Sequence, residues 1–342
     1  MINLYSDTQT LPTPPMREAM AHAPVGDEQR GADPSVNALC ERVADLLGQE
    51  SAVFLPSGTM CNEIAIRVHC QPGDEVIADR TSHIINFEGG GPAAISGVML
   101  QPVDGVAGIY DVEQAAAAIR YPNRYSPRTR LIAVEQTANL GGGTIWPKER
   151  IKALAALATE NGLGFHMDGA RLMNAAVASG EAPSTYATPC DSVWIDLSKG
   201  LGCPVGGVLA GSQSFIDDVW IWKQRFGGAM RQAGILAAAG LYALDHHVER
   251  LAVDHDNAAR LAHGLADIDG IDVDLPTVQT NIVYFALRDP NRSADNMVSA
   301  LNERGVVVGA MGPQRLRAVT HLDVSSEDVD TALNEVAAVM NA

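Results

Sequence analysis

The chain reads GLGFHMDGAR over residues 162–171 and SVWIDLSKGLG over residues 192–202. Each stretch begins as a short apolar run of strand type and ends in small and polar residues. A carboxylate (Asp168), a guanidinium (Arg171) and an amine (Lys199) therefore follow two strand ends. Because open α/β sheets bind ligands at the carboxyl ends of their strands, these stretches predict a mostly parallel sheet with a ligand site at this edge.

The chemistry of Lys199 and Asp168 indicates which ligand is bound. A lysine used for covalent chemistry needs a carbonyl partner, and a buried aspartate needs a cation. Pyridoxal phosphate (PLP) provides both, since its aldehyde can bond Lys199 and its ring nitrogen can pair with Asp168. A plain turn aspartate and an exposed loop lysine are the alternatives. The small residues after Lys199 favour a tight loop that approaches a ligand, so the sequence predicts a PLP enzyme.

Apolar runs of strand type alternate with helical runs between residues 51 and 211, which predicts an α/β fold. The expected strands are 75–79, 98–103, 131–136, 162–167, 192–197 and 205–210, and the expected helices are 112–120, 147–160 and 229–247. A C-terminal unit follows, with helices at 250–265 and 326–341 and strands at 281–286, 306–308 and 316–322. The prediction is therefore a large domain (1–245, with an N-terminal arm), its sheet lying between helices, and a smaller α+β domain (246–342).

Charge and cysteine content exclude several classes of protein. The 342 residues include 24 basic and 41 acidic ones, a net charge of −17 that argues against nucleic acid or an anionic membrane as partner. Five cysteines without a Cys-x-x-Cys pair argue against a structural zinc or a disulfide framework. No apolar segment resembles a signal peptide or reaches the length of a membrane span. We therefore expect a cytoplasmic enzyme without a metal.

Two further segments supply candidate cofactor ligands. Gly58 and Thr59 open a helical pattern, and the free N–H groups and dipole of a helix N-terminus favour a phosphate dianion. An ordinary Ser-Gly turn that caps a helix is the alternative. His83 follows the expected strand 75–79, where its ring could stack on the pyridine and exchange a proton with substrate. A structural histidine is the alternative at this position.

Candidate substrate ligands lie near both ends of the chain. Arg171, three residues after Asp168, could pair with the cofactor's ring hydroxyl or with a substrate carboxylate. Arg317 shares a strand face with Val319 and needs an anion, so we expect it to bind the substrate carboxylate, with Ser6 assisting. Arg315 is the competing candidate, and an ordinary salt bridge of Arg317 is the alternative.

Seven segments carry a resemblance to a known family. They are SDT (6–8), GDE (26–28) with DPSVN (33–37), PSGTM (56–60), DGAR (168–171), SKGLG (198–202), GGAMRQ (227–232) and RAVTH (317–321). Together they resemble the threonine aldolases of low-specificity L-threonine or L-allo-threonine type. That family belongs to the fold-type-I PLP enzymes, which have a PLP-dependent transferase-like fold, and to the wider β-eliminating lyase group.

The resemblance implies an activity and an assembly. The family reaction is the reversible cleavage of a β-hydroxy-α-amino acid, such as threonine, phenylserine or 3-hydroxyaspartate, into glycine and an aldehyde. The family also implies a homotetramer, a dimer of dimers, with active sites at the subunit interfaces. By the same analogy Lys223 and Arg231 approach the cofactor phosphate of a neighbouring subunit, and His83 is the candidate base for the substrate hydroxyl.

The sequence departs from the family pattern at two positions. Ala138, in EQTAN (135–139), stands where the family has an active-site histidine linked to hydroxyl recognition. The resemblance therefore does not fix the preference between threo and erythro substrates. Arg30 stands where relatives usually have tyrosine, and we hypothesise that it favours an acidic or polar aldehyde such as glyoxylate.

Two other functions remain open at this point. The same cofactor chemistry could break a different bond, giving β-elimination to ammonia and a keto acid. Alternatively, the chain could be a catalytically silent binding protein with a PLP-enzyme fold. A nicotinamide-dependent Rossmann enzyme is excluded, because no Gly-x-Gly-x-x-Gly follows the first strand.

Overall fold

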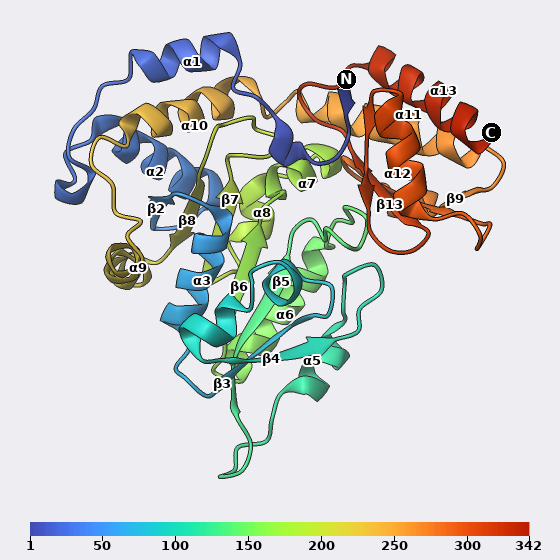
Figure 1. Ribbon diagram of the computed structural model, residues 1–342. Helices are drawn as coiled ribbons and strands as arrows, with labels where there is room; N and C mark the ends of the chain where they lie inside the picture. Colours follow the sequence, from blue (N-terminus) through green and yellow to red (C-terminus); the bar gives the residue numbers. More distant parts are fainter. Residues whose placement is uncertain (342) are drawn as a thin grey trace.

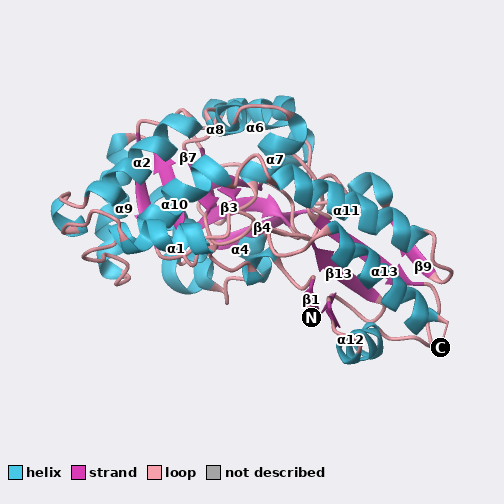
Figure 2. Cartoon of the chain, turned by 90° about the horizontal axis from the view of Figure 1, so that it is seen from above, coloured by secondary structure: helices cyan, strands magenta, loops and turns pink. Residues whose placement is uncertain are grey.

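The structure is a computed structural model that describes residues 1–341, and it divides into a large unit and a smaller C-terminal unit (Figure 1). Among the described residues, no helix is long and apolar enough to cross a bilayer. The two units lie side by side, each with its sheet packed against helices (Figure 2).

A seven-stranded sheet forms the centre of the large unit, in the order β2-β8-β7-β6-β5-β3-β4. Its strands are β2 (Ser51–Leu55), β3 (Asp74–Asp79), β4 (Met99–Val103), β5 (Arg128–Glu135), β6 (Gly164–Gly169), β7 (Ser192–Asp196) and β8 (Gly207–Gly211). Strands β3 to β7 pair in parallel, whereas β8 runs antiparallel to both β2 and β7. The acidic residues that end β5, β6 and β7 therefore meet at one edge of the sheet.

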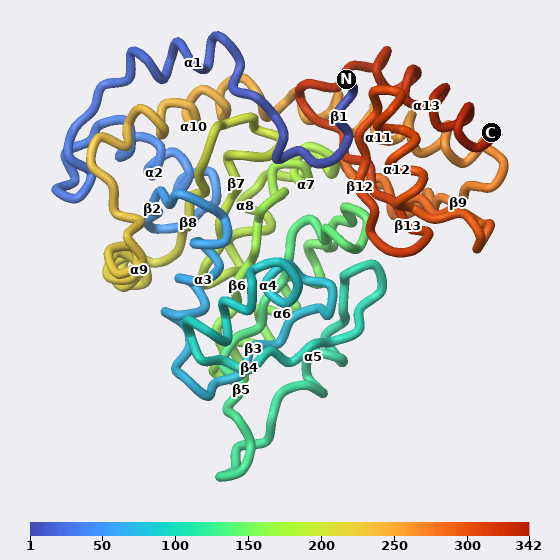
Figure 3. The backbone as a smooth tube through the Cα atoms, viewed as in Figure 1, coloured from blue at the N-terminus to red at the C-terminus, as the bar shows by residue number. Residues whose placement is uncertain are grey.

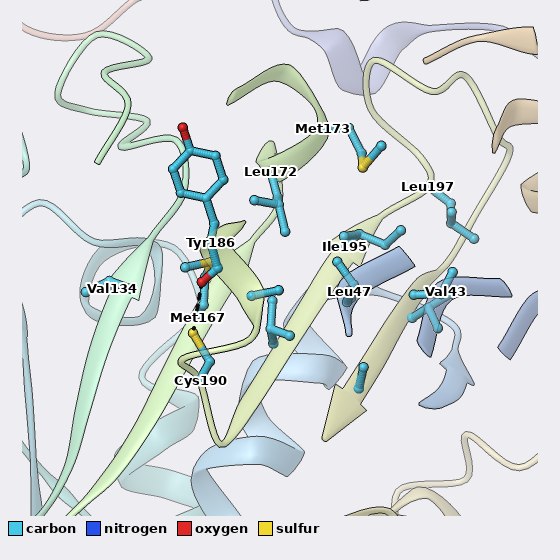
Figure 4. Close-up of a cluster of buried hydrophobic side chains, with 14 of the residues drawn as sticks. Val43, Leu47, Val134, Met167, Leu172, Met173, Tyr186, Cys190, Ile195 and Leu197 are labelled. Carbon is cyan, nitrogen blue, oxygen red and sulfur yellow. Dashed lines mark hydrogen bonds between the residues drawn. The ribbon is translucent and has the colours of Figure 1, made fainter. Parts of the chain in front are cut away.

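Helices cover both faces of this sheet, which explains why its strands are apolar on both sides. The helical elements are α1 (Pro14–Ala21), α2 (Pro34–Leu47), α3 (Gly58–His69), α4 (His83–Asn86), a π-helix (Pro92–Ser96), α5 (Val112–Ala118), α6 (Lys148–Glu160), α7 (Leu172–Ser179), α8 (Pro183–Ala187), α9 (Gln213–Arg225) and α10 (Gly234–His246). On β7, Trp194 packs with α3 and α9, while Val193 and Ile195 pack with α2, α6, α8 and α10. Figure 4 shows part of the core on the Val193 and Ile195 side of the sheet, with Ile195 and Leu197 facing Val43 and Leu47 of α2.

The smaller unit has an antiparallel sheet in the order β12-β13-β10-β9. Its elements are α11 (Leu251–Ala266), β9 (Ile271–Val273), β10 (Ile282–Leu287), α12 (Ala294–Glu303), β12 (Gly309–Ala310), β13 (Arg315–Val319) and α13 (Ser326–Met340). The start of the chain joins this unit: β1 (Ile2–Asn3) pairs in parallel with β11 (Val306–Val307), and Leu4 is buried in the C-terminal core. Figure 3 shows the N-terminus beside the C-terminal elements. The first residues thus pack with the smaller unit, a pairing that the sequence did not predict.

All six strands predicted between residues 75 and 210 are present, and so is the α/β class. The long helix predicted from residue 229 is wrong at its start, because α10 begins at Gly234. Residues before it are bound elsewhere: the Met230 N–H donates to Glu28 Oε2 at 2.8 Å, and the Arg231 carbonyl accepts from the Glu28 N–H at 2.9 Å. The predicted strand 316–322 likewise ends early, at Val319.

Candidate active site

A cavity of about 190 Å³ lies at the carboxyl edge of the central sheet. It is lined by Ser57, Gly58, Thr59, His83, Asp168, Trp194, Asp196 and Lys199. Five of these residues were predicted from the sequence as cofactor ligands or catalytic groups, although they come from four separate segments of the chain. Because the parallel strands end at the same edge, the fold brings these segments together.

Lys199 lies in the loop after β7 and is largely buried. Its Nζ is 2.9 Å from Asp196 Oδ2 and 5.7 Å from the centre of the Trp194 ring. The other oxygen of Asp196 accepts from the Ser198 N–H and hydroxyl, at 2.7 and 2.9 Å. Thr10 donates to the Lys199 carbonyl at 2.9 Å, so the N-terminal segment also fixes this loop. The amine is thus held in the cavity by a carboxylate that is itself oriented.

Asp168 ends β6 and is held by two donors. Its Oδ1 accepts from the Ala170 N–H at 3.0 Å, and its Oδ2 accepts from Asn62 Nδ2 at 2.8 Å. The carboxylate is buried and makes no ion pair within the described part of the chain. Burying a carboxylate without a cation is costly, so this side chain fits a ligand that brings its own positive charge.

The N-terminus of α3 forms another wall of the cavity. Ser57 caps the helix by accepting from the Met60 N–H at 3.2 Å, and the N–H groups of Gly58 and Thr59 have no acceptor within the helix. A Cβ on Gly58 would lie 2.2 Å from the Trp194 ring, so only glycine allows this close approach. A helix N-terminus, a lysine amine and an uncompensated carboxylate in one cavity match the phosphate, aldehyde and pyridine nitrogen of PLP.

His83 begins α4 and faces three carboxyl groups. Its Nδ1 is 2.9 Å from Glu88 Oε1, and its backbone N–H donates to Glu135 Oε2 at 2.5 Å. Burial opposes the charged imidazolium, but the hydrogen bond to Glu88 and the charges of Asp168 and Glu135 outweigh it and raise the pKa of His83. The acidic neighbours therefore favour the protonated ring, and an imidazole in this place can act as a general acid or base.

His83, Glu88 and Asp168 each place one potential metal-ligand atom within 4.8 Å of the others. The amide of Asn62 donates into this cluster, to Glu88 Oε1 at 2.7 Å and to Asp168 at 2.8 Å. One amide group thus holds both carboxylates by hydrogen bonds. The cluster is therefore a hydrogen-bonded network.

Glu63 on α3 lies beside Glu88, and these two side chains contain buried oxygens that lack hydrogen-bond partners. Both oxygens of Glu63, and Oε2 of Glu88, lack a hydrogen-bond partner among the described residues. Burial, together with the negative charge of Glu88, raises the pKa of Glu63 to about 8. A proton on Glu63 that is donated to Glu88 Oε2 satisfies one oxygen of each side chain. Gly91 leaves the necessary space, since a Cβ there would lie 1.8 Å from Glu63 Oε1.

We expect Glu63→Gln to remove part of the pH dependence of stability. A carboxyl whose folded pKa is raised stabilises the fold below its unfolded pKa, and that contribution is lost as the pH rises through about 8. The glutamine amide keeps an N–H donor at every pH, whereas glutamic acid loses its proton as the pH rises. The urea midpoint of the variant should therefore rise relative to that of the wild type between about pH 6 and about pH 9. Parallel midpoints across this range would contradict the shared proton.

The partner of Arg171 is a residue that the sequence did not predict. Its Nε and Nη2 donate to the two oxygens of Asp7, both at 2.7 Å, and both side chains are buried. Asn281 of the smaller unit adds a 3.0 Å hydrogen bond to Asp7. Burial disfavours the carboxylate of Asp7, but the charge and hydrogen bonds of Arg171 outweigh it and hold its pKa below the usual range. Asp7 thus occupies the Nε and Nη2 donors of Arg171, which the sequence analysis offered to a substrate carboxylate.

Arg317 on β13 keeps part of its guanidinium available. Its Nη1 donates to Asn139 Oδ1 at 3.1 Å and its Nη2 to the Tyr5 carbonyl at 3.3 Å. Its Nε has no partner, and no carboxylate of the described residues pairs with it. Ser6 is buried next to Asp7 and accepts from the Thr8 N–H at 3.2 Å. Arg317 therefore remains the candidate for binding a substrate carboxylate.

Six predicted residues do not line this cavity: Ser6, Arg171 and Arg317, which are described above, and Lys223, Arg231 and Arg30. Lys223 is completely buried, with its Nζ paired to Glu28 and 4.2 Å from the Trp220 ring centre, so it has no surface to offer a neighbouring subunit. Its predicted approach to a neighbour's phosphate does not fit this placement. Arg231 is exposed and paired with Asp27 at 3.1 Å, and Arg30 is exposed at the end of a short 3₁₀ turn (Glu28–Arg30).

The sequence did not identify four residues that organise the site: Asn62, Glu88, Asp196 and Asp7. Each is a common residue with no special local pattern, and Asn62 and Asp7 have partners far along the chain. The position of Asn62, one helical turn after Gly58 on a predicted helix that enters the site, was the available signal. Asp196, three residues before Lys199, offered a similar one.

Comparison with known proteins gives related results along nearly the whole chain. Residues 3–288 match the family model described as beta-eliminating lyase. The low specificity L-threonine aldolase of Escherichia coli (strain K12) is 42% identical over 339 residues, which are 99% of this chain and 98% of that protein. Low-specificity L-threonine aldolase 1 of Arabidopsis thaliana is 40% identical over 338 residues, or 97% and 94%. The solved threonine aldolase of Leishmania major superposes with a TM-score of 0.85 at 20% identity, covering 99% and 100% of the two chains.

Proposed function

Because the chain belongs to the threonine aldolases within the beta-eliminating lyase family, we propose that it cleaves β-hydroxy-α-amino acids reversibly into glycine and an aldehyde. It is an aldehyde-lyase that uses PLP, and L-threonine or L-allo-threonine is the expected substrate. The observation that carries this proposal is the single cavity that holds Lys199, Asp168, His83 and the N-terminus of α3.

Each residue of the cavity has a separate task. Bound PLP supplies an electron-accepting ring that stabilises the negative charge left at Cα when the Cα–Cβ bond breaks. Asp168 would hold the proton of the ring nitrogen, Lys199 would bond the aldehyde carbon, and α3 would bind the phosphate through Gly58 and Thr59. Asp196 keeps the amine of Lys199 in place.

The substrate is held at two points. Arg317, with Ser6, would bind the carboxylate and so orient the Cα–Cβ bond for cleavage. Arg171 forms a buried ion pair with Asp7 and so fixes the N-terminal segment that carries Ser6. His83 takes the proton of the β-hydroxyl as the bond breaks, and the acidic groups that raise its pKa favour the protonated ring that results.

Product analysis tests this function. Purified protein loaded with PLP is given L-threonine, L-allo-threonine, phenylserine and 3-hydroxyaspartate. We expect glycine and an aldehyde in equal amounts from at least one of them. Ammonia with a keto acid would mean that the enzyme is instead a β-eliminating lyase. Bound chromophore without any turnover would indicate the catalytically silent alternative.

The same substrate panel tests Arg30. We propose that its guanidinium favours a substrate with an acidic aldehyde portion, such as 3-hydroxyaspartate. Arg30→Tyr should lower the ratio of 3-hydroxyaspartate to threonine turnover, because tyrosine carries no charge at neutral pH. An unchanged ratio would remove this proposal. With alanine at position 138, we expect threonine and allo-threonine to be cleaved at similar rates.

Assembly and location are also proposals. We propose a homotetramer, a dimer of dimers, whose exposed Arg231 lies near a neighbour's cofactor site, and a cytoplasmic location. Light scattering coupled to gel filtration gives the mass of the assembly and tests the first of these directly.

A further inference from the structure

A buried amide links the two sides of the active site. Asn62 on α3 is completely buried and makes four side-chain contacts. Its Nδ2 lies 2.7 Å from Glu88 Oε1 and 2.8 Å from Asp168 Oδ2, while its Oδ1 lies 2.7 Å from Trp194 Nε1 and 3.1 Å from His166 Nε2. All four hydrogen-bonding positions of the amide are therefore used.

The chemistry of the neighbours fixes which way this amide faces. The indole N–H of Trp194 can only donate, so the Asn62 atom beside it must be the oxygen. The Nδ2 group then donates one hydrogen to each carboxylate. This orientation suits both pairs of neighbours, because carboxylates accept and the indole donates.

The same argument fixes the ring of His166. Since Asn62 Oδ1 accepts, His166 carries its proton on Nε2, and its Nδ1 accepts from the Ser192 hydroxyl at 2.8 Å. Ser192 in turn accepts from His69 Nε2 at 2.8 Å. Burial lowers the pKa of His166 to about 3, which keeps this ring neutral. An amide does not pass protons on, so the series is a fixed set of donors aimed at Asp168 and Glu88, not a proton path.

The orientation extends to His83. Glu88 Oε1 accepts from Asn62 and lies 2.9 Å from His83 Nδ1. A carboxylate held this way requires a proton on Nδ1, which leaves Nε2 as the free basic nitrogen of the neutral ring.

We propose that Asn62 and Glu88 are positioning residues: Asn62 holds the Glu88 carboxylate, and Glu88 holds a proton on Nδ1 of His83, so that Nε2 accepts the proton of the substrate hydroxyl. The last step rests on the proposed aldolase function. The placement of the proton on His83 does not, because it follows from the hydrogen-bond donors alone.

The groups that face His83 predict how two substitutions act on its pKa. They are Glu88 with Glu63 behind it, Asp168 from β6, Glu135 from β5, and Asp196 and Lys199 across the cavity. Glu88→Gln removes a negative charge while its amide oxygen still accepts both hydrogen bonds, so the pKa of His83 should fall. Asn62→Asp replaces two donors with a carboxyl group among acids, so this pKa should rise. Structural damage does not explain opposite shifts from adjacent substitutions.

The test is nitrogen NMR of protein labelled with ¹⁵N-histidine and free of cofactor, with His83 assigned by its loss in His83→Asn. The wild type should carry its neutral-form proton on Nδ1. The pKa of His83 should fall by about one unit in Glu88→Gln and rise by roughly half a unit or more in Asn62→Asp. Asn257→Asp is the control, since Asn257 is another buried amide, which donates to the Val324 carbonyl in the smaller unit. This control substitution should leave the pKa of His83 unchanged.

Each outcome decides the matter. A proton on Nε2 in the wild type would overturn the proposal without any variant, so it remains testable even if Asn62→Asp does not fold. Shifts of the same sign in the two variants, or no shift in either, would overturn the proposal as well.

The acid limb of kcat/KM for threonine should move with the pKa of His83. If the pKa of His83 shifts in the variants but the acid limb of kcat/KM does not move, another group is the base. The proposal then fails, while the aldolase function stands. Absence of glycine production would refute the function and leave the NMR result intact.

Discussion

Lys199→Ala should lower kcat for threonine cleavage by at least about 10³-fold, because it removes the group that bonds the cofactor aldehyde. Lys199 is the only lysine that lines the cavity among the described residues. Glycine release measures the loss of rate. Mass analysis of the intact protein after borohydride reduction measures the loss of the covalent bond to the cofactor, which the wild type should retain.

Lys199→Arg separates charge from bonding in this experiment. Arginine keeps a positive group near Asp196, yet its guanidinium does not bond an aldehyde as an amine does. We expect it to be as inactive as the alanine variant, with an unfolding midpoint close to that of the wild type. Activity above about a tenth of wild type in either variant would show that Lys199 is not the bonding residue.

Asp7→Asn should lower the free energy of unfolding by about 3–5 kcal/mol, because it leaves the guanidinium of Arg171 buried without its counter-charge. The pair joins the N-terminal segment to the loop after β6, and Asn281 ties it to the smaller unit. The effect should therefore appear in both units. Urea unfolding followed by circular dichroism measures it.

An exposed ion pair is the matched control. Arg260 and Asp330 form a pair with the same bidentate geometry, at 2.6 and 2.7 Å, but their side chains are about half exposed. Asp330→Asn should change the free energy of unfolding by less than about 1 kcal/mol. Similar losses in the two variants would mean that burial of the Asp7 pair contributes nothing.

The pH dependence of the Asp7 contribution follows from the sign of its pKa shift. The pKa of Asp7 is below its unfolded value, so its stabilising effect is fully present above about pH 4 and is lost as the pH falls further. The difference in stability between the wild type and Asp7→Asn should therefore shrink in acid.

The sequence was sufficient for much of the fold, because strand and helix leave different apolar periods. It predicted β3 to β8 and the closing helix α13. It did not reveal that β8 runs antiparallel, since a strand buried on both faces has the same pattern in either direction. The early part of the long helix was also mispredicted. Its alanine-rich composition favours helix, but contacts to Glu28 hold residues 230 and 231 in another conformation.

Some residues of the site could be predicted from the sequence and others could not. Lys199, Asp168 and the start of α3 were predictable, because strand ends and helix starts place them at one edge of the sheet. Their partners were not. Asp7 is 164 residues from Arg171, and Asn62 is 106 residues from Asp168, so nothing local connects them. A sequence motif identifies groups that touch a ligand, whereas the groups that hold them are identified only once the chain is folded.

The pairing of β1 with β11 also orders events during synthesis. Ile2 and Asn3 are synthesised long before their partners Val306 and Val307, which lie far along the chain. The loop between the two strands therefore closes only after β11 has left the ribosome. Until then the N-terminal segment, which carries Ser6 and Asp7, has no β11 strand to anchor it. The large unit can assemble earlier, but the segment that holds Arg171 is anchored only after β11 has been made.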